Sequence, residues 1–203
     1  SSLAKAEQHK GRPVPTFITL PDYIAVAGPV RAGQHAGFLG SGYDPLVPKG
    51  DPNSEDYELV DLGLVPSVQK ARLRDRRGLL NNGNAQLQHL EHSGVGRTLN
   101  GYYEKAFSVL ESGATHKAFD IKAEPDKVRE RYGTGNTKVH IDGNGAPRVP
   151  QNFLTARRLI EAGARVVTVN YSKWDWHGGS YNTIFNREKE DFPVFDKAIT
   201  ALV

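Results

Sequence analysis

The chain has 203 residues, no cysteine and a formal net charge of +3 at pH 7, which excludes disulfides and thiol chemistry and gives no argument for nucleic acid as a partner. Hydrophobic residues make up 38% of the chain, while Gly occupies 21 positions and Pro 12, as expected of a small sheet surrounded by many loops. No run approaches the roughly 20 consecutive apolar residues of a membrane-spanning helix, so the sequence predicts no transmembrane segment.

The first part of the chain predicts short strands followed by helices. Residues 1–15 are polar and end in Pro-Val-Pro, which indicates a linker. Residues 16–20 and 23–27 are short extended pieces broken by Gly and Pro, and residues 17–20 predict a buried strand. Residues 67–120 predict a helical segment, because Ser67 is a candidate N-cap and apolar side chains then recur at helical spacing.

Residues 151–203 predict an αβ unit, the best-defined part of the chain. Residues 151–162 predict a helix that ends at Gly163, a natural C-cap. Residues 165–171 form the best strand in the sequence, and a further helix is predicted from about Asp191. The sequence therefore indicates an α/β fold.

The loop after this strand carries the most informative motif, Trp174-Asp-Trp-His-Gly-Gly179. It lies just past the carboxyl end of a strand, where α/β sheets bind their ligands. Asp175 and His177 project to the same side of an extended chain and are a candidate pair of metal ligands. An oxygen and an imidazole suit zinc or another transition metal better than calcium. In the alternative interpretation, His177 hydrogen-bonds Asp175 within the loop and the two Trp pack around them.

Four stretches occur in the same order as the motifs of one bacterial family. They are Gly33-Gln-His-Ala-Gly-Phe-Leu-Gly-Ser-Gly-Tyr-Asp-Pro45, Leu73-Arg-Asp-Arg-Arg-Gly-Leu-Leu80, Lys127-Val-Arg-Glu-Arg-Tyr-Gly133, and residues 151–170 with Trp174-Asp-Trp-His-Gly178. On these motifs the chain resembles the domain of unknown function 1501 family, sulfatase-like proteins of the alkaline phosphatase superfamily. It departs from the family at Trp176, where a small residue is usual, and at residues 133–150, which read as an inserted hairpin or loop.

The resemblance implies a fold, with residues 1–15 kept as a linker. Residues 16–203 would be the central part of one alkaline-phosphatase-like domain, a partial three-layer α/β/α sandwich with a helical and loop-rich insertion. Family members are longer and carry an export signal, so we expect an exported protein of the periplasm or cell surface, of which this fragment alone would be inactive.

The resemblance also implies a function, a sulfatase-like or phosphatase-like metal-dependent ester hydrolase. Asp175 and His177 would bind a divalent metal, zinc or else manganese, iron or calcium. Trp174, Trp176, Lys173 and His35 would contact the substrate, a sulfated or phosphorylated small molecule or polysaccharide. The catalytic nucleophile is not identified. The alternative is a non-catalytic exported protein that keeps the fold and binds a glycan or another protein, which Trp176 favours because an indole between the ligands would block the site.

Overall fold

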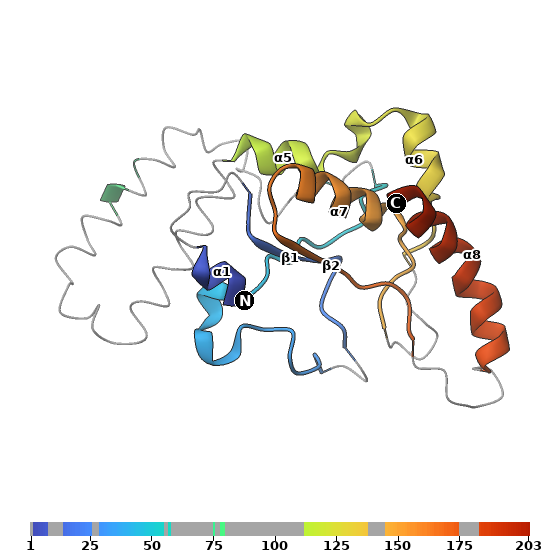
Figure 1. Cartoon of the computed structure of the whole chain (residues 1–203), viewed down its shortest axis with the longest axis horizontal. Helices are drawn as coiled ribbons and strands as arrows, with labels where there is room; N and C mark the ends of the chain where they lie inside the picture. Colours follow the sequence, from blue (N-terminus) through green and yellow to red (C-terminus); the bar gives the residue numbers. More distant parts are fainter. Residues whose placement is uncertain are drawn as a thin grey trace.

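The computed structural model describes residues 2–7, 14–25, 29–54, 57, 75, 78–79, 112–137, 145–174 and 183–203 (Figure 1). Within these ranges the chain is a mixed α/β structure with five α-helices and a small parallel sheet. The Asp-Trp-His motif at 175–177 and nearly all of the predicted helical segment before residue 112 lie outside the described residues. None of the described helices is long and apolar enough to cross a membrane.

In the described part of the chain the sheet consists of two short parallel strands, β1 (Phe17–Leu20) and β2 (Val166–Val169). Their register runs from Phe17 opposite Val166 to Leu20 opposite Val169. On its other edge β1 pairs with Leu46 through two backbone hydrogen bonds of 2.8 and 2.9 Å. Both strands lie within the runs predicted from the sequence, which are confirmed as strands at 17–20 and 166–169.

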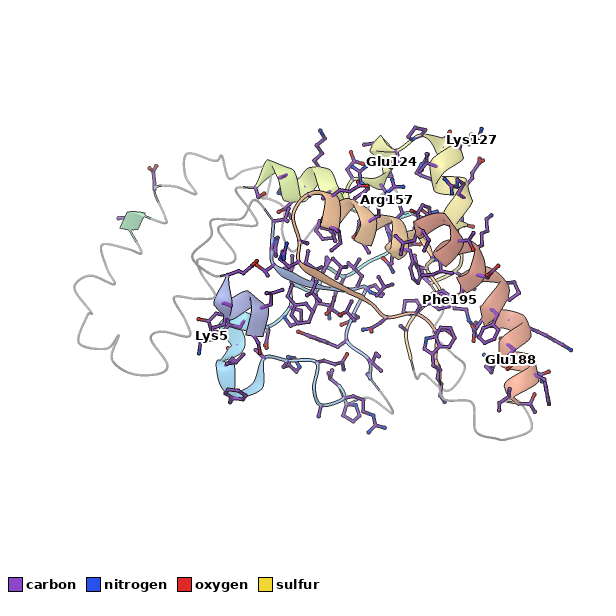
Figure 2. The ribbon with its side chains drawn as sticks, in the orientation of Figure 1. Lys5, Glu124, Lys127, Arg157, Glu188 and Phe195 are labelled. Carbon is purple, nitrogen blue, oxygen red and sulfur yellow. The ribbon has the colours of Figure 1, made fainter. Side chains whose placement is uncertain are left out.

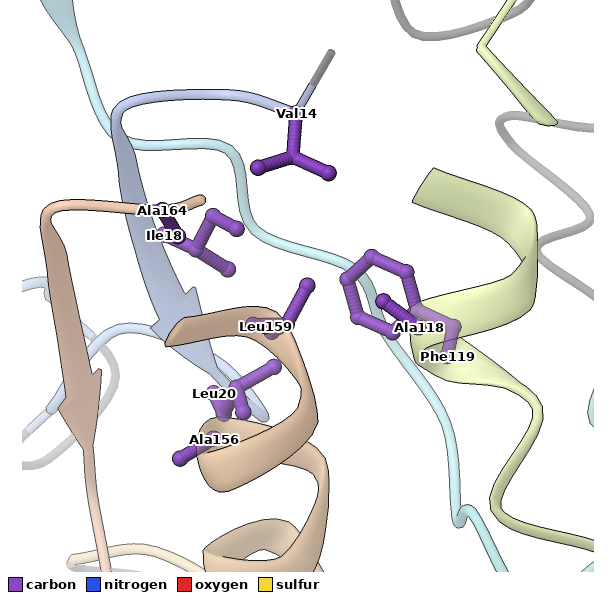
Figure 3. Packing of buried hydrophobic residues seen from close by; sticks show 8 residues of the cluster. All are labelled: Val14, Ile18, Leu20, Ala118, Phe119, Ala156, Leu159 and Ala164. Atoms are coloured by element: carbon purple, nitrogen blue, oxygen red, sulfur yellow. The ribbon is translucent and has the colours of Figure 1, made fainter. Parts of the chain in front are cut away.

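Helix α7 (Gln151–Glu161) covers one face of this sheet. It ends where predicted, because Ala162 closes the last turn and Gly163 adopts φ 111°, a left-handed conformation that Gly takes without a steric cost. Leu159 is fully buried, and burying a Leu contributes roughly 1.5–3 kcal/mol. Figure 3 shows it on α7 among the other residues of its cluster. The buried residues of this first cluster are Val14, Ile18, Leu20, Ala118, Phe119, Ala156, Leu159 and Ala164.

Helix α5 (Gly113–Phe119) completes the first cluster. The Ser112 hydroxyl accepts a hydrogen bond from the backbone N–H of Thr115, a typical N-cap. At the other end of α5, Arg158 of α7 donates to the carbonyl oxygens of Lys117 and Ala118 at 2.6 and 3.1 Å. Arg158 therefore satisfies carbonyl groups that the end of a helix leaves unpaired, and it joins α5 to α7.

A second hydrophobic cluster lies between α7, α6 (Asp126–Tyr132) and α8 (Ile184–Leu202). Its buried residues are Ile121, Tyr132, Phe153, Leu154, Tyr171 and Ala198. Beside it, Arg157 of α7 lies 3.2 Å from the Glu124 carboxylate, and the two side chains are labelled in Figure 2. Helix α8 begins seven residues before the predicted start at Asp191, because the Thr183 hydroxyl caps it by accepting from the N–H of Asn186.

The polar N-terminal stretch contains a short helix, α1 (Ser2–Ala6), which lies on the other side of the strands from α7 in the view of Figure 1. Glu7, which follows it, is buried and lies 3.8 Å from Arg165, just before β2. The division of the chain into a linker and one domain stays a prediction, as does the wider three-layer sandwich of the alkaline phosphatase type.

Candidate functional site

The loops that follow β1 and β2 are bonded to each other at the carboxyl edge of the sheet. The buried Asn170 side chain donates to the carbonyl of Asp22 at 2.6 Å, and its backbone N–H donates to the carbonyl of Leu20 at 2.7 Å. Ligands of open α/β sheets bind beyond this edge. The segment that leads to Asp175 and His177 therefore starts at the end of the sheet where a site is expected.

The chain leaves β2 through an unusual backbone conformation at Ser172. Ser172 has φ 53°, the left-handed region that residues other than Gly rarely adopt, and it is buried. Its carbonyl oxygen accepts a hydrogen bond of 2.9 Å from the N–H of Ala146. We call residues 145–150 the strap, since they cross this loop before entering α7. The strap was part of the predicted insertion at 133–150.

Trp174, a predicted substrate-binding residue, lies against an aromatic cluster contributed by α7, α8 and the start of its own loop. Its ring centroid is 5.1 Å from that of Phe195 and 6.1 Å from those of Tyr171 and Phe192, and Figure 2 labels Phe195 on α8. Phe153 of α7 completes the cluster at 5.8 Å from Phe195. Trp174 is still 49% exposed, so the indole has one packed side and one accessible side.

A polar network centred on the buried Asp191 contacts Tyr171, where the same loop begins. Asp191 of α8 is fully buried and accepts a hydrogen bond from Arg148 of the strap. Glu190 lies 3.3 Å from Arg148 and 3.0 Å from Arg187, so two acids alternate with two arginines. The Tyr171 hydroxyl donates to the backbone carbonyl of Asp191 at 3.4 Å. Burial, helped by the negative charge of Asp191 and opposed by Arg148, raises the pKa of Tyr171 to about 12.

His35, the predicted site histidine that the structure describes, belongs to a different cluster. Its Nδ1 lies 3.4 Å from the Asp44 carboxylate, whose second oxygen accepts from the N–H of Ala36 at 2.5 Å. Its ring lies 4.5 Å from that of Tyr23, just after β1. The contacts of His35 thus hold its own loop against the segment after β1, whereas Trp174 packs on α8, and the structure does not bring these two predicted residues together.

The metal pair itself, with Trp176, lies outside the described residues, so Asp175 and His177 stay a prediction. Within the described part of the chain, no group of three or more His, Asp or Glu side chains is arranged to hold a metal ion. Lys173 lies on the strap side of the loop, since its Cβ is within 2.9 Å of the position that a Gly145 side chain would take. The sequence analysis did not identify Gly145, Arg148 or Asp191 as residues that support the site. The one sequence signal for this group was the glycine itself, in the inserted stretch.

Comparison with known proteins gives one assignment. No match was found among curated proteins, and none among solved structures. The sequence profile of a family described as "Protein of unknown function (DUF1501)" matches residues 1–203, the whole chain. The chain therefore belongs to the DUF1501 family, as its four motifs predicted.

Proposed function

We propose that the chain is part of a sulfatase-like, metal-dependent hydrolase of sulfate or phosphate esters, with Asp175 and His177 as metal ligands. The observation that supports this proposal is the construction of the loop that carries them. It leaves the carboxyl edge of a parallel sheet, it is hydrogen-bonded to the loop after β1, and it holds a non-glycine residue in a left-handed conformation. Such costly local conformations occur preferentially at functional sites.

The donor types near this loop suit a transition metal. Asp175 supplies an oxygen and His177 a nitrogen, which zinc, manganese and iron all accept. A bound divalent ion would polarise an ester oxygen and lower the pKa of a coordinated water or hydroxyl. In this proposal Trp174 and Trp176 form the wall of the site, and the Lys173 ammonium attracts the anionic ester group.

A polyanionic substrate fits the same arrangement. A sulfated or phosphorylated polysaccharide would place its anionic group at Lys173 and a sugar ring on the exposed side of Trp174, since aromatic faces are common apolar contact surfaces for ligands. We propose in addition that the protein acts outside the cytoplasm, in the periplasm or at the cell surface, where such polymers occur.

The test is elemental analysis of the purified natural full-length protein beside an Asp175→Ala/His177→Ala variant. We expect stoichiometric zinc, manganese or iron in the parent protein and none in the variant. The matched control is His116→Ala/Asp196→Ala, which removes the same two side-chain types from α5 and α8 and is expected to keep the metal. Absence of metal from the parent protein would exclude the hydrolase proposal.

A non-catalytic binding protein is the second candidate, favoured by the aromatic surface that Trp174 and Phe192 expose together. Phe192 is 45% exposed and its ring lies 6.1 Å from that of Trp174. This candidate predicts no bound metal, together with binding of a sulfated glycan that is lost in Trp174→Ala. Metal that depends on Asp175 and His177 would count against it.

A further inference from the structure

We propose that Gly145 is a positioning residue for the metal ligands, because the strap fixes the direction in which the chain leaves β2. This inference rests on the proposed function, since Asp175 and His177 are the ligands concerned. It assigns a role to residues of the inserted stretch, which lies far from the Asp-Trp-His motif in sequence.

The strap and the loop after β2 approach each other too closely for any side chain at position 145. An ideal Cβ on Gly145 would lie 2.6 Å from the carbonyl oxygen of Ser172 and 2.9 Å from the Cβ of Lys173. Gly145 also has φ 85°, which residues with a side chain rarely adopt. The two backbones can therefore approach this closely only because residue 145 has no side chain.

Hydrogen bonds on either side of Gly145 fix the same contact. Ala146 donates to the carbonyl of Ser172 at 2.9 Å, and Gly145 donates to the carbonyl of Ala25 at 3.4 Å. The strap thus bonds to the segment after β1 and to the loop after β2. These bonds hold Ser172 at φ 53°, and Trp174 and Asp175 follow within three residues.

The far end of the strap is fixed to the helical layer. Arg148 forms its ion pair with the fully buried Asp191 of α8, Val149 is buried, and Pro150 precedes the first residue of α7. A group added at position 145 cannot be accommodated by moving the strap outward without breaking these contacts. The backbone of the loop after β2, at Ser172 and Lys173, must move instead.

The experiment is a titration of the metal-free full-length protein with zinc in competition with a chelator, combined with thermal unfolding. We expect Gly145→Ala to bind zinc about 10–100-fold more weakly, the loss typical when a residue supporting metal ligands is altered. The matched control is Gly50→Ala, at another left-handed glycine whose added Cβ would lie 3.2 Å from the Tyr57 ring. That variant also places a side chain at a positive φ, away from the loop after β2, and is expected to keep the zinc affinity of the parent.

A second variant covers the case in which Gly145→Ala does not fold. Ser172→Gly removes the steric cost at φ 53° and leaves the turn free to take other conformations. We expect it to fold at least as stably as the parent and to bind zinc roughly two- to fivefold more weakly, because the freed backbone must be ordered again on binding.

The outcomes separate the two proposals. A parent protein that binds no zinc overturns the proposed function, and this inference with it. A parent that binds zinc, with parental affinity in Gly145→Ala and Ser172→Gly, leaves the metal site standing and refutes the positioning role of the strap. Equal losses in Gly145→Ala and Gly50→Ala refute it as well, since general destabilisation would then explain both.

Discussion

The ion pair between Arg148 and Asp191 allows a quantitative prediction of how a substitution changes the free energy of unfolding. Asp191 is fully buried, and Arg148 is its hydrogen-bonding partner. Removing one member of a buried pair leaves an uncompensated charge and costs about 3–5 kcal/mol. Arg148 keeps Glu190 at 3.3 Å, so we expect Asp191→Ala to cost about 3 kcal/mol, at the low end of that range.

The assay is a double-mutant cycle measured by urea and thermal unfolding. For a chain of this length each kcal/mol of lost stability shifts Tm by about 2–4 °C, so Asp191→Ala should melt about 6–12 °C lower than the parent. Arg148→Met and Asp191→Leu alone should each be strongly destabilising. The double variant should lie within about 1 kcal/mol of the parent, because it buries no unpaired charge.

The cycle would refute the reasoning if the two single costs simply add. Residues without contact give additive effects within about 0.3–0.5 kcal/mol, whereas we expect a coupling of at least about 2 kcal/mol. Additive costs would mean that the Arg148–Asp191 pair does not hold the strap to α8. The proposed positioning role of Gly145 would then lack the contact that keeps the strap in place.

Three further predictions concern Tyr171, Phe195 and Arg158. The pKa of Tyr171 is raised from 10.0 to about 12, so its contribution to stability is complete below pH 10 and is lost as the pH rises towards 12. In unfolding measured against pH, Tyr171→Phe should therefore lose less stability than the parent between pH 10 and 12. Phe195→Ala removes the centre of the aromatic cluster and should cost about 2–3 kcal/mol, while Phe185→Ala, at a 73% exposed position of the same helix, should stay within about 0.5 kcal/mol in urea unfolding. Arg158→Ala should cost about 2–3 kcal/mol by removing the donors to the end of α5. Lys49→Ala, which removes a 67% exposed side chain 3.6 Å from the half-exposed Asp22, should cost less than about 1 kcal/mol in the same assay.

The strands and the αβ unit were predictable because their signals are local. Residues 165–171 contain three Val and a Thr, which suit a half-buried pleated surface, and Gly163 stops the preceding helix. The start of α8 was predicted too late because Pro193 lies inside the helix, where a proline is normally a sign of a helix boundary. Packing of Phe195 and Ala198 against the second cluster outweighs that local cost.

The strand that precedes the candidate site was predictable, whereas the side chains that support the loop after it were not. The position of the Asp-Trp-His motif after a strand follows from chain order alone, and β2 is that strand. The pairing of Arg148 with Asp191, 43 positions apart, has no local pattern, since a charged residue reads as a solvated one until its burial is known. The close approach of Gly145 to Ser172 cannot be read from the sequence either. A loop glycine gives the same sequence signal whether other atoms occupy the position of a Cβ or leave it open.

The parallel pairing of β1 with β2 has a consequence for how the chain acquires its structure. Val166 lies 149 positions after its partner Phe17, and closing a loop of that length costs about 4 kcal/mol of chain entropy before any contact compensates for it. At a synthesis rate of about 5–20 residues per second, β1 emerges roughly 7–30 seconds before the strand that completes its sheet. During that interval Ile18 and Leu20, which are buried in the finished protein, have neither β2 nor α7 to cover them. The nascent chain therefore presents a short apolar strand with an open edge to chaperones and to other nascent chains until residues 151–169 have been made.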